Sequence, residues 1–175
     1  MKSISDDFEI YKYKVSNWQE KKDKLIETFY KTNPRIYGNV FTNFNSGKQN
    51  KFFLNSVIEK LFKNDIEKFL TDIDDNDYHL DASWMQLYEK NMSHKLHNHG
   101  VGYSSVIYIN FDKEVHSSTI FVDKANSKSF LPEVEEGDII FFNSEHYHHC
   151  PTHKSDITRM ICSFNLKKRL KMFYA

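Results

Sequence analysis

"HKLHNHGVGYSSVIYIN", residues 94–110, places three histidines within six positions, directly before a run that alternates like a β-strand. In a strand, residues two apart project from the same face, so His97 and His99 can direct both imidazoles at one point. A metal ion is the ordinary reason for such convergence, because neutral imidazole binds iron, zinc, copper and nickel. His94 lies off this alternation, and we expect it at the surface.

A second group of histidines follows about fifty residues later, in "GDIIFFNSEHYHHCPTH", residues 137–153. This segment opens with a Gly–Asp turn, continues as an apolar strand and ends in four histidines. Two histidine groups, each beside an apolar strand, indicate a metal site at the mouth of a β-barrel. Counting six residues from Phe142 favours His148 as the distal ligand, with His149 as the second choice and His146 as the third.

The rest of the chain predicts helices first and strands afterwards. Residues 8–15 alternate as a strand, whereas 16–34 and 49–73 carry apolar residues at helical spacing. Five later segments have a period of two and are expected to be strands: 78–91, 102–111, 118–124, 137–144 and 158–166. This order predicts a mainly β, α+β fold, in which a sandwich or jelly-roll barrel carries helices on one face. We expect a single domain, 1–175, with a helical part at 1–75 and the barrel at 77–166.

Composition narrows the functional classes. The 24 basic residues balance the 24 acidic residues, which argues against a nucleic-acid partner. No apolar run approaches the ~20 residues that span a bilayer, so no membrane partner is expected. With only two cysteines in the sequence, we expect no disulfide framework, and this favours a cytoplasmic location. Arginine occurs only at positions 35, 159 and 169, and Arg159 stands in an apolar strand eleven residues after His148.

Four segments, between about residues 80 and 166, resemble those of the iron(II)- and 2-oxoglutarate-dependent oxygenases, in particular the small families common in phage and marine bacterial genomes. The strand before the site, the histidines with their strand, the Gly–Asp turn and the closing strand stand in that family's order: "SWMQLYEKN" (83–91), "HNHGVGYSSVIYIN" (97–110), "PEVEEGDIIFF" (132–142) and "RMICSFN" (159–165). The resemblance implies a double-stranded β-helix with iron held between two sheets.

By the same resemblance, His97 and His148 are iron ligands and Arg159 binds the far carboxylate of 2-oxoglutarate. It implies a dioxygenase, an oxidoreductase that uses dioxygen, hydroxylates a small molecule or a peptide, and releases succinate and carbon dioxide. Two positions depart from the family pattern. His99 stands where the usual triad has an aspartate, which would give three histidine ligands. Ile161 stands where the closing strand usually has a serine, and Tyr108 or Tyr88 is a candidate to replace its hydrogen bond.

Two other interpretations stay open. A three-histidine cupin dioxygenase that needs no 2-oxoglutarate would share the barrel and the ligands. However, Tyr103 and Ser104 occupy the positions of the cupin glutamate, and such an enzyme has no standing need for Arg159. A jelly-roll binding module without catalytic activity would carry the histidines only on its rim. The sequence predicts neither the substrate nor the oligomeric state.

Overall fold

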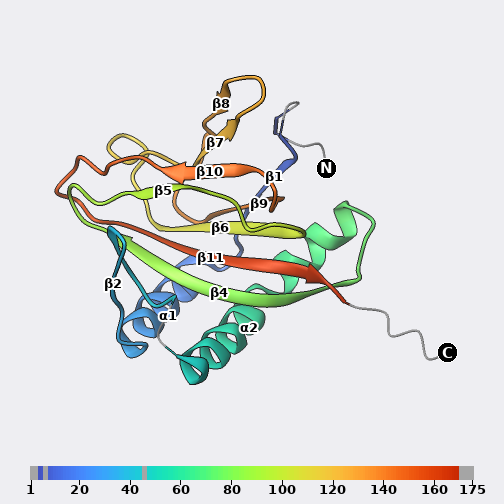
Figure 1. Cartoon of the computed structure of the whole chain (residues 1–175). Coiled ribbons are helices and arrows are strands. Elements are labelled where there is room, and N and C mark those ends of the chain that lie inside the picture. The colour runs from blue at the N-terminus through green and yellow to red at the C-terminus, as the bar shows by residue number, and fades with distance from the viewer. Residues whose placement is uncertain (1–3, 6–7, 45–46, 170–175) are drawn as a thin grey trace.

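The computed structural model describes residues 4–5, 8–44 and 47–169, which form two α-helices and eleven β-strands in two antiparallel sheets (Figure 1). The larger sheet has the order β1 (Ile10–Lys14), β9 (Asp138–Asn143), β6 (Tyr103–Asn110), β11 (Arg159–Lys168), β4 (Tyr78–Tyr88), β3 (Val40–Thr42) and β2 (Arg35–Tyr37). The smaller sheet has the order β5 (His94–His97), β10 (Tyr147–Cys150), β7 (Ile120–Asp123) and β8 (Lys128–Phe130).

The larger sheet is buried on both faces, which explains its apolar strands. In β9, Ile139 and Phe141 point toward the helices, while Ile140 and Phe142 point toward the smaller sheet. A strand that is covered on both sides reads as a continuous apolar run instead of an alternating one. The smaller sheet lies over one face and the helices over the other, which confirms the expected jelly-roll fold with helices on one face (Figure 1).

The two helices are α1 (Trp18–Lys31) and α2 (Lys48–Asp72). Their buried aromatic residues face the outer side of the larger sheet, and the ring of Phe69 stacks on that of Phe141 with centroids 4.2 Å apart. Each such aromatic side chain contributes about 1.5–3 kcal/mol when it is removed from water. The helices therefore act as a lid that keeps the sheet's outer face dry. Within the described residues, no helix is long and apolar enough to cross a bilayer.

Several short strands differ from the sequence expectation. The strand β1 lies within the strand expected at residues 8–15, whereas β2 and β3 are additional strands in a part of the chain expected to be mainly helical. The strands β2, β3, β5, β8 and β10 are three or four residues long. Such lengths are too short for a period of two to be recognised. Pairing with a neighbouring strand defines them instead: β3 pairs with β4, β5 with β10, and β8 with β7.

The loop between β5 and β6 depends on Gly102. Its φ is +121°, and an added Cβ would lie 2.4 Å from the carbonyl oxygen of Leu166. Gly100, in the same loop, has a φ of +75° but nothing within 4 Å of its Cβ position. The backbone at Gly102 passes against β11 because no side chain separates them.

Gly102→Ala is therefore expected to lower the free energy of unfolding by about 3 kcal/mol, through backbone strain and a clash with a fixed carbonyl. Gly100→Ala is the matched control and should cost only about 1 kcal/mol, from its left-handed backbone alone. Denaturant unfolding of both variants measures the difference. Equal losses would show that the contact with Leu166 does not constrain the loop.

Candidate metal centre

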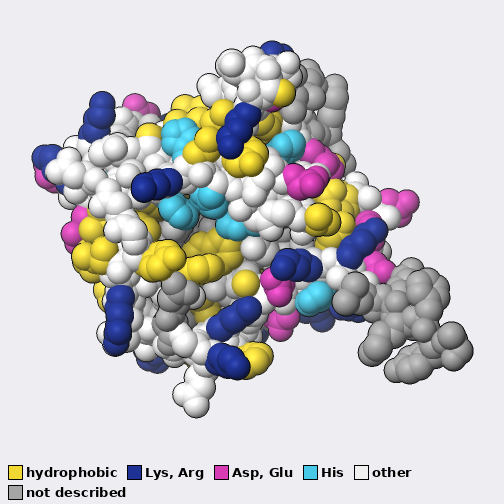
Figure 2. Space-filling model, in the orientation of Figure 1, with side chains coloured by type: hydrophobic (Ala, Val, Ile, Leu, Met, Phe, Trp, Pro, Cys, Tyr) yellow, Lys and Arg dark blue, Asp and Glu magenta, His cyan; other side chains and the backbone are white. Residues whose placement is uncertain are grey.

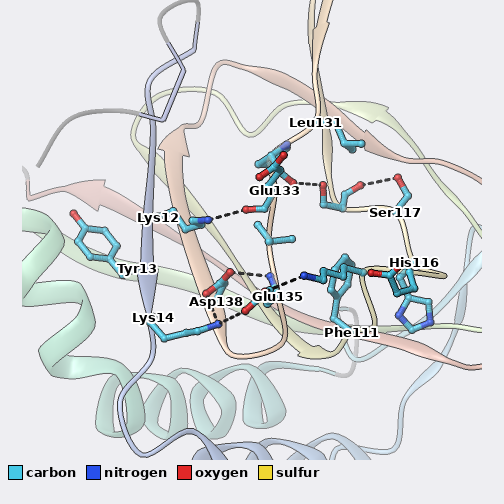
Figure 3. Close-up of a pocket in the computed structure, with 15 residues that line it drawn as sticks. Lys12, Tyr13, Lys14, Phe111, His116, Ser117, Leu131, Glu133, Glu135 and Asp138 are labelled. Atoms are coloured by element: carbon cyan, nitrogen blue, oxygen red, sulfur yellow. Dashed lines mark hydrogen bonds and ion pairs between the residues drawn. The ribbon is translucent and has the colours of Figure 1, made fainter.

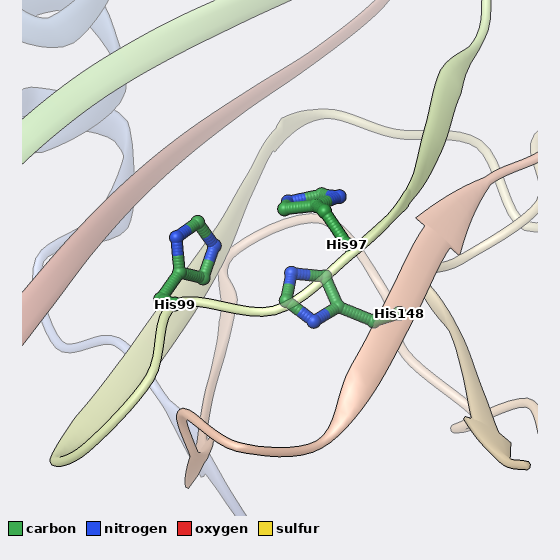
Figure 4. A group of neighbouring side chains, drawn as sticks. All are labelled: His97, His99 and His148. Atoms are coloured by element: carbon green, nitrogen blue, oxygen red, sulfur yellow. The ribbon is translucent and has the colours of Figure 1, made fainter.

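Three imidazoles converge between the sheets. The candidate ligand nitrogens of His97, His99 and His148 all lie within 4.8 Å of one another. The ring centroids are 4.3 Å apart for His97 and His148, 4.9 Å for His97 and His99, and 5.1 Å for His99 and His148. Figure 4 shows the three rings turned toward a common point. The structure thus brings together the three histidines that the sequence singled out.

Different backbone features place these histidines. His97 and His148 are direct neighbours across the antiparallel pair β5–β10. His99 follows the end of β5, so the strand alternation expected for His97 and His99 is wrong in detail. The amide of His99 instead donates to the carbonyl of Ser144 at 2.9 Å, and the Asn98 side chain donates to the carbonyl of Glu145 at 3.3 Å. These two bonds hold the loop so that the His99 ring faces the strand pair.

Hydrogen bonds select the tautomers of two of the rings. Nδ1 of His97 lies 2.7 Å from the carbonyl oxygen of Lys95, and Nδ1 of His148 lies 2.9 Å from that of His146. A carbonyl only accepts, so each Nδ1 carries the proton and donates it. Each Nε2 then keeps its lone pair, which is the usual preparation of a histidine for metal binding.

The environment also keeps these imidazoles neutral. Burial, followed by the neighbouring His97, lowers the pKa of His148 to about 3 and that of His99 to about 4. Burial lowers the pKa of His97 as well. Near neutral pH the rings are therefore unprotonated, as metal ligands must be.

His94 lies beside this group and not at the surface, as the sequence led us to expect. In the β5–β10 pair, His97 faces His148 and His94 faces Cys150, so β5 uses three steps where β10 uses two. This bulge turns His94 to the same side as His97, with ring centroids 4.3 Å apart. The Gln86 amide donates to Nδ1 of His94 at 3.1 Å. A bulge leaves no recognisable mark in a sequence, so this position could not be predicted.

The other histidines near the site are not part of the converging group. His149 reaches the edge of the cavity at the three imidazoles, but its ring nitrogens lie outside that group. His146 accepts a hydrogen bond from the amide of Glu9 at 3.3 Å, and its ring packs on Phe8. His153 is buried and its Nε2 lies 2.7 Å from the carbonyl oxygen of Ile157.

Arg159 lines the same cavity and is 1% exposed. Its guanidinium carbon lies 4.9 Å from the centre of the Tyr88 ring, and its Nη1 donates to the sulfur of Cys150. Among the described residues, its Nε and Nη2 have no hydrogen-bond partner. A buried cation with two unused donors is costly unless an anion binds it. Arg159 is therefore a buried cation in its strand and not an exposed residue.

The two candidate tyrosines differ in position. Tyr88 lines the cavity, and its hydroxyl donates to Oε1 of Gln86 at 3.2 Å. Tyr108 is fully buried and is not among the residues that line the cavity; its hydroxyl donates to Oγ1 of Thr119 at 3.3 Å. Burial raises the pKa of both phenols, so both stay protonated. Only Tyr88 is placed to contact a ligand at the histidines.

The cavity between the three imidazoles and Arg159 is small, about 20 Å³, which is room for about one water molecule. Among the described residues that line it, none is acidic. A much larger hollow of about 740 Å³ lies elsewhere (Figure 3). There Lys14 pairs with Asp138 at 2.9 Å and Lys113 with Glu135 at 3.3 Å. Because both lysines are paired with carboxylates, the described residues that line this hollow do not offer an unpaired buried cation like Arg159.

Comparison with known proteins agrees with this arrangement. Residues 82–165 match the family described as "Putative 2OG-Fe(II) oxygenase", in which 2OG is 2-oxoglutarate. The matched segment runs from β4 to β11 and contains His97, His99, His148 and Arg159. No curated protein matches the chain.

Solved structures share the fold at low sequence identity. The 2-oxoglutarate complex of a viral collagen prolyl hydroxylase from Paramecium Bursaria Chlorella virus-1 has a TM-score of 0.67 and 15% identity, covering 96% of this chain and 100% of that one. HygX from Streptomyces hygroscopicus, with nickel, 2-oxoglutarate and hygromycin B bound, has a TM-score of 0.71 and 10% identity, covering 96% and 85%. An oxidoreductase of the 2OG-Fe(II) oxygenase family from Burkholderia pseudomallei has a TM-score of 0.65 and 10% identity, covering 85% and 78%.

The segment 82–165 thus belongs to the iron(II)- and 2-oxoglutarate-dependent oxygenases, which are oxidoreductase enzymes. This confirms the resemblance found in the sequence. It also confirms, at the level of the family, the expected cofactors iron(II) and 2-oxoglutarate.

We expect one divalent transition-metal ion to bind per chain. His148→Ala should weaken binding at least about 100-fold, because loss of a ligand removes a coordinate bond from a three-residue site. His149→Ala should bind as the unchanged protein does, and exposed His79→Ala is the surface control. Anaerobic titration with iron(II) measures the affinity of each variant, and metal analysis measures the number of ions bound per chain. A larger loss in His149→Ala than in His148→Ala would reverse the assignment of the distal ligand.

Proposed function

We propose that this chain is an iron(II)- and 2-oxoglutarate-dependent dioxygenase that hydroxylates its substrate, with His97, His99 and His148 holding the iron and Arg159 binding the far carboxylate of 2-oxoglutarate. One observation carries this proposal. A fully buried guanidinium with two unpartnered donors shares a cavity with three neutral, converging imidazoles. That combination fits a metal ion together with a small acid that reaches from the metal to the arginine.

The residues fit iron(II) in number and in chemistry. Three imidazoles on one side of the ion would leave its remaining positions open for a bidentate oxo-acid and dioxygen. Bound together, iron(II), 2-oxoglutarate and dioxygen supply the oxidative decarboxylation that yields succinate and carbon dioxide and delivers one oxygen atom to the substrate. The protein orients these groups and excludes water from the site.

Arg159 supplies what the dicarboxylate needs. A guanidinium stays charged at any physiological pH and offers a planar pair of donors that matches a carboxylate. In the cavity, Cys150 already accepts the bond from Nη1, while Nε and Nη2 remain for a ligand. The cavity of about 20 Å³ is smaller than 2-oxoglutarate, so its binding must displace side chains. The neutral thiol of Cys150 is the partner that a charged carboxylate would most easily replace.

The position of Ile161 defines how the carboxylate is held. Ile161 lines the cavity and provides no hydrogen bond where the family usually has a serine. Tyr88 is the available substitute, because its hydroxyl lies at the cavity and donates to the neutral amide oxygen of Gln86. A carboxylate near this hydroxyl would be a stronger acceptor than the amide. We therefore assign Tyr88, and not Tyr108, as the second contact of the far carboxylate.

Arg159 also separates this proposal from the cupin alternative. A three-histidine dioxygenase without 2-oxoglutarate would leave a buried, unneutralised guanidinium beside its metal, at a large cost in stability. The family match of residues 82–165 points the same way.

Arg159→Ala is expected to raise the KM for 2-oxoglutarate about 100-fold, because two charge-assisted hydrogen bonds are lost. Iron affinity should change little, since Arg159 is not a proposed ligand. The test is 2-oxoglutarate decarboxylation without added substrate, together with anaerobic titration of the metal-to-ligand charge-transfer band. The control is Tyr108→Phe, which removes a hydroxyl that bonds Thr119 and does not line the cavity, and should leave the KM unchanged. A KM that does not respond to Arg159→Ala contradicts the co-substrate assignment.

His99→Asp tests the unusual third ligand. If the His99 ring binds iron, aspartate should preserve or improve iron affinity, because a carboxylate is the usual third ligand. His99→Ala should weaken affinity, and His94→Asp is the control for placing a carboxylate beside the site. If iron affinity is the same in His99→Asp, His99→Ala and the unchanged protein, His99 lies outside the coordination sphere.

A further inference from the structure

The larger sheet extends past the smaller sheet on the side where the histidines lie. Its last two strands, β3 and β2, follow β4 at one edge, whereas the smaller sheet ends at β5. On the inner face of this hairpin, Val40 packs in the core between the sheets, but Tyr37, its partner across the hairpin, is 58% exposed. Phe44, just after β3, is 52% exposed. The inner face of the hairpin is therefore open beside the metal centre.

Aromatic rings connect this open face to the imidazoles. The ring centroids are 5.2 Å apart for Trp84 and His99, 5.5 Å for Phe44 and Trp84, and 6.3 Å for Tyr37 and Phe44. We call Tyr37, Phe44 and Trp84 the aromatic shelf. Figure 2 shows the histidines of this side beside a broad apolar area. The shelf leads from the surface directly to a proposed iron ligand.

Hydrogen bonds hold the shelf in place. The Asn39 side chain, at the hairpin turn, donates to the carbonyl of Asn91 at 3.1 Å and to the hydroxyl of Ser93 at 3.3 Å. At the other end, Thr42 donates to the carbonyl of Met85 at 2.8 Å, and the Met85 amide donates to the Asn43 side chain at 2.7 Å. The exposed rings of Tyr37 and Phe44 thus stand on a fixed backbone, as a binding surface with a low ordering cost would, whereas Trp84 at the inner end of the shelf is 5% exposed.

Charge further restricts what this surface would accept. Arg35 and Tyr37 stand two apart on β2, on one face of the hairpin, and both line a hollow of about 430 Å³. Among the described residues that line this hollow, Arg35 alone is charged, and none of those that line the metal cavity is acidic. A ligand on the shelf would therefore meet aromatic faces in the middle and a cation at its outer end.

We propose that the aromatic shelf is the substrate site, and that the substrate carries a flat apolar ring next to an anionic group. The ring lies against Phe44, at the edge of the largely buried Trp84 that contacts His99, and the anion points toward Arg35. This inference rests on the proposed oxygenase function, because that function gives the ring a reason to lie near the iron. Such a ring can belong to a free small acid or to a side chain next to an acidic residue in a peptide.

Trp84 can report on this binding. The chain has two tryptophans, and Trp18 lies away from the shelf, where its indole nitrogen donates to Glu136. In Trp18→Phe protein, the fluorescence of Trp84 is followed anaerobically, with iron(II) and 2-oxoglutarate present so that Arg159 is occupied. The probes are 3-phenylpropionate, its neutral amide, and hexanoate. We expect 3-phenylpropionate to bind best, the amide about threefold more weakly because an exposed ion pair is modest, and hexanoate about tenfold more weakly because it lacks a ring.

Shelf variants then assign the contacts. Phe44→Ala should weaken 3-phenylpropionate and its amide alike, by about threefold to tenfold. Arg35→Ala should weaken only the acid. Matched controls are Tyr30→Ala, a 63% exposed aromatic residue on α1, and Arg169→Ala, an exposed arginine; neither should change binding. An end-capped Phe–Glu dipeptide distinguishes the sources: binding as tight as that of the free acid indicates a peptide substrate, and weaker binding indicates a small acid.

The outcomes separate this inference from the function on which it rests. Equal affinities for the three probes, or no response to Phe44→Ala, overturn the shelf; intact iron binding and 2-oxoglutarate decarboxylation would then leave the oxygenase function standing. If the probes bind as expected to protein that takes up no iron and decarboxylates no 2-oxoglutarate, the shelf is a binding site and the oxygenase function is wrong.

Discussion

The site depends on one pairing constraint, the antiparallel register of β5 with β10. This register sets His97 directly opposite His148, with the ring centroids 4.3 Å apart. A shift by one residue would turn one of these rings to the outer face of the sheet and leave no pair. Two further features depend on this register. The bulge in β5 brings His94 to the pair, and the bond from the His99 amide to Ser144 brings the His99 ring to it.

The sequence carried the parts of the site that lie on long or strongly apolar strands. His148 was identifiable because the apolar run of β9 ends six residues before it, and Arg159 because its strand resembles the closing strand of the family. Prediction failed where tertiary contacts decide. The turn of His94 toward the site results from a bulge, which depends on the partner strand and not on local sequence. The hairpin β2–β3 is held by the pairing of β3 with β4, and its three-residue strands are too short to show a period of two in the sequence.

The two faces of the larger sheet differ in the residues that they carry. Residues that point outward from β9, β6 and β11 join the helices in one apolar core, which includes Phe141, Ile107 and Phe164. The alternate residues of β4 and β11 point inward and include Trp84, Arg159 and Ser163, which line the cavity. Apolar cores on both faces, with Phe121 and Phe142 in the inner one, stabilise the fold, so it tolerates a buried cation with two unbonded donors at the cavity. That tolerance is what makes an anion-binding group available beside the imidazoles.

Replacing the usual aspartate by His99 changes the charge that the site presents to a substrate. With two histidines and a carboxylate, the charges of iron(II), the arginine and a dianionic co-substrate would cancel. With three neutral imidazoles as ligands, and no acidic residue among the described residues that line the cavity, one positive charge would remain once 2-oxoglutarate had bound. In a partly buried site such a charge is screened weakly, so it favours an anionic substrate near the iron. Arg35 extends the same preference to the outer end of the aromatic shelf. The third histidine thus does more than replace a ligand: it makes the charge of the loaded site and the charge of the substrate site favour the same class of molecule.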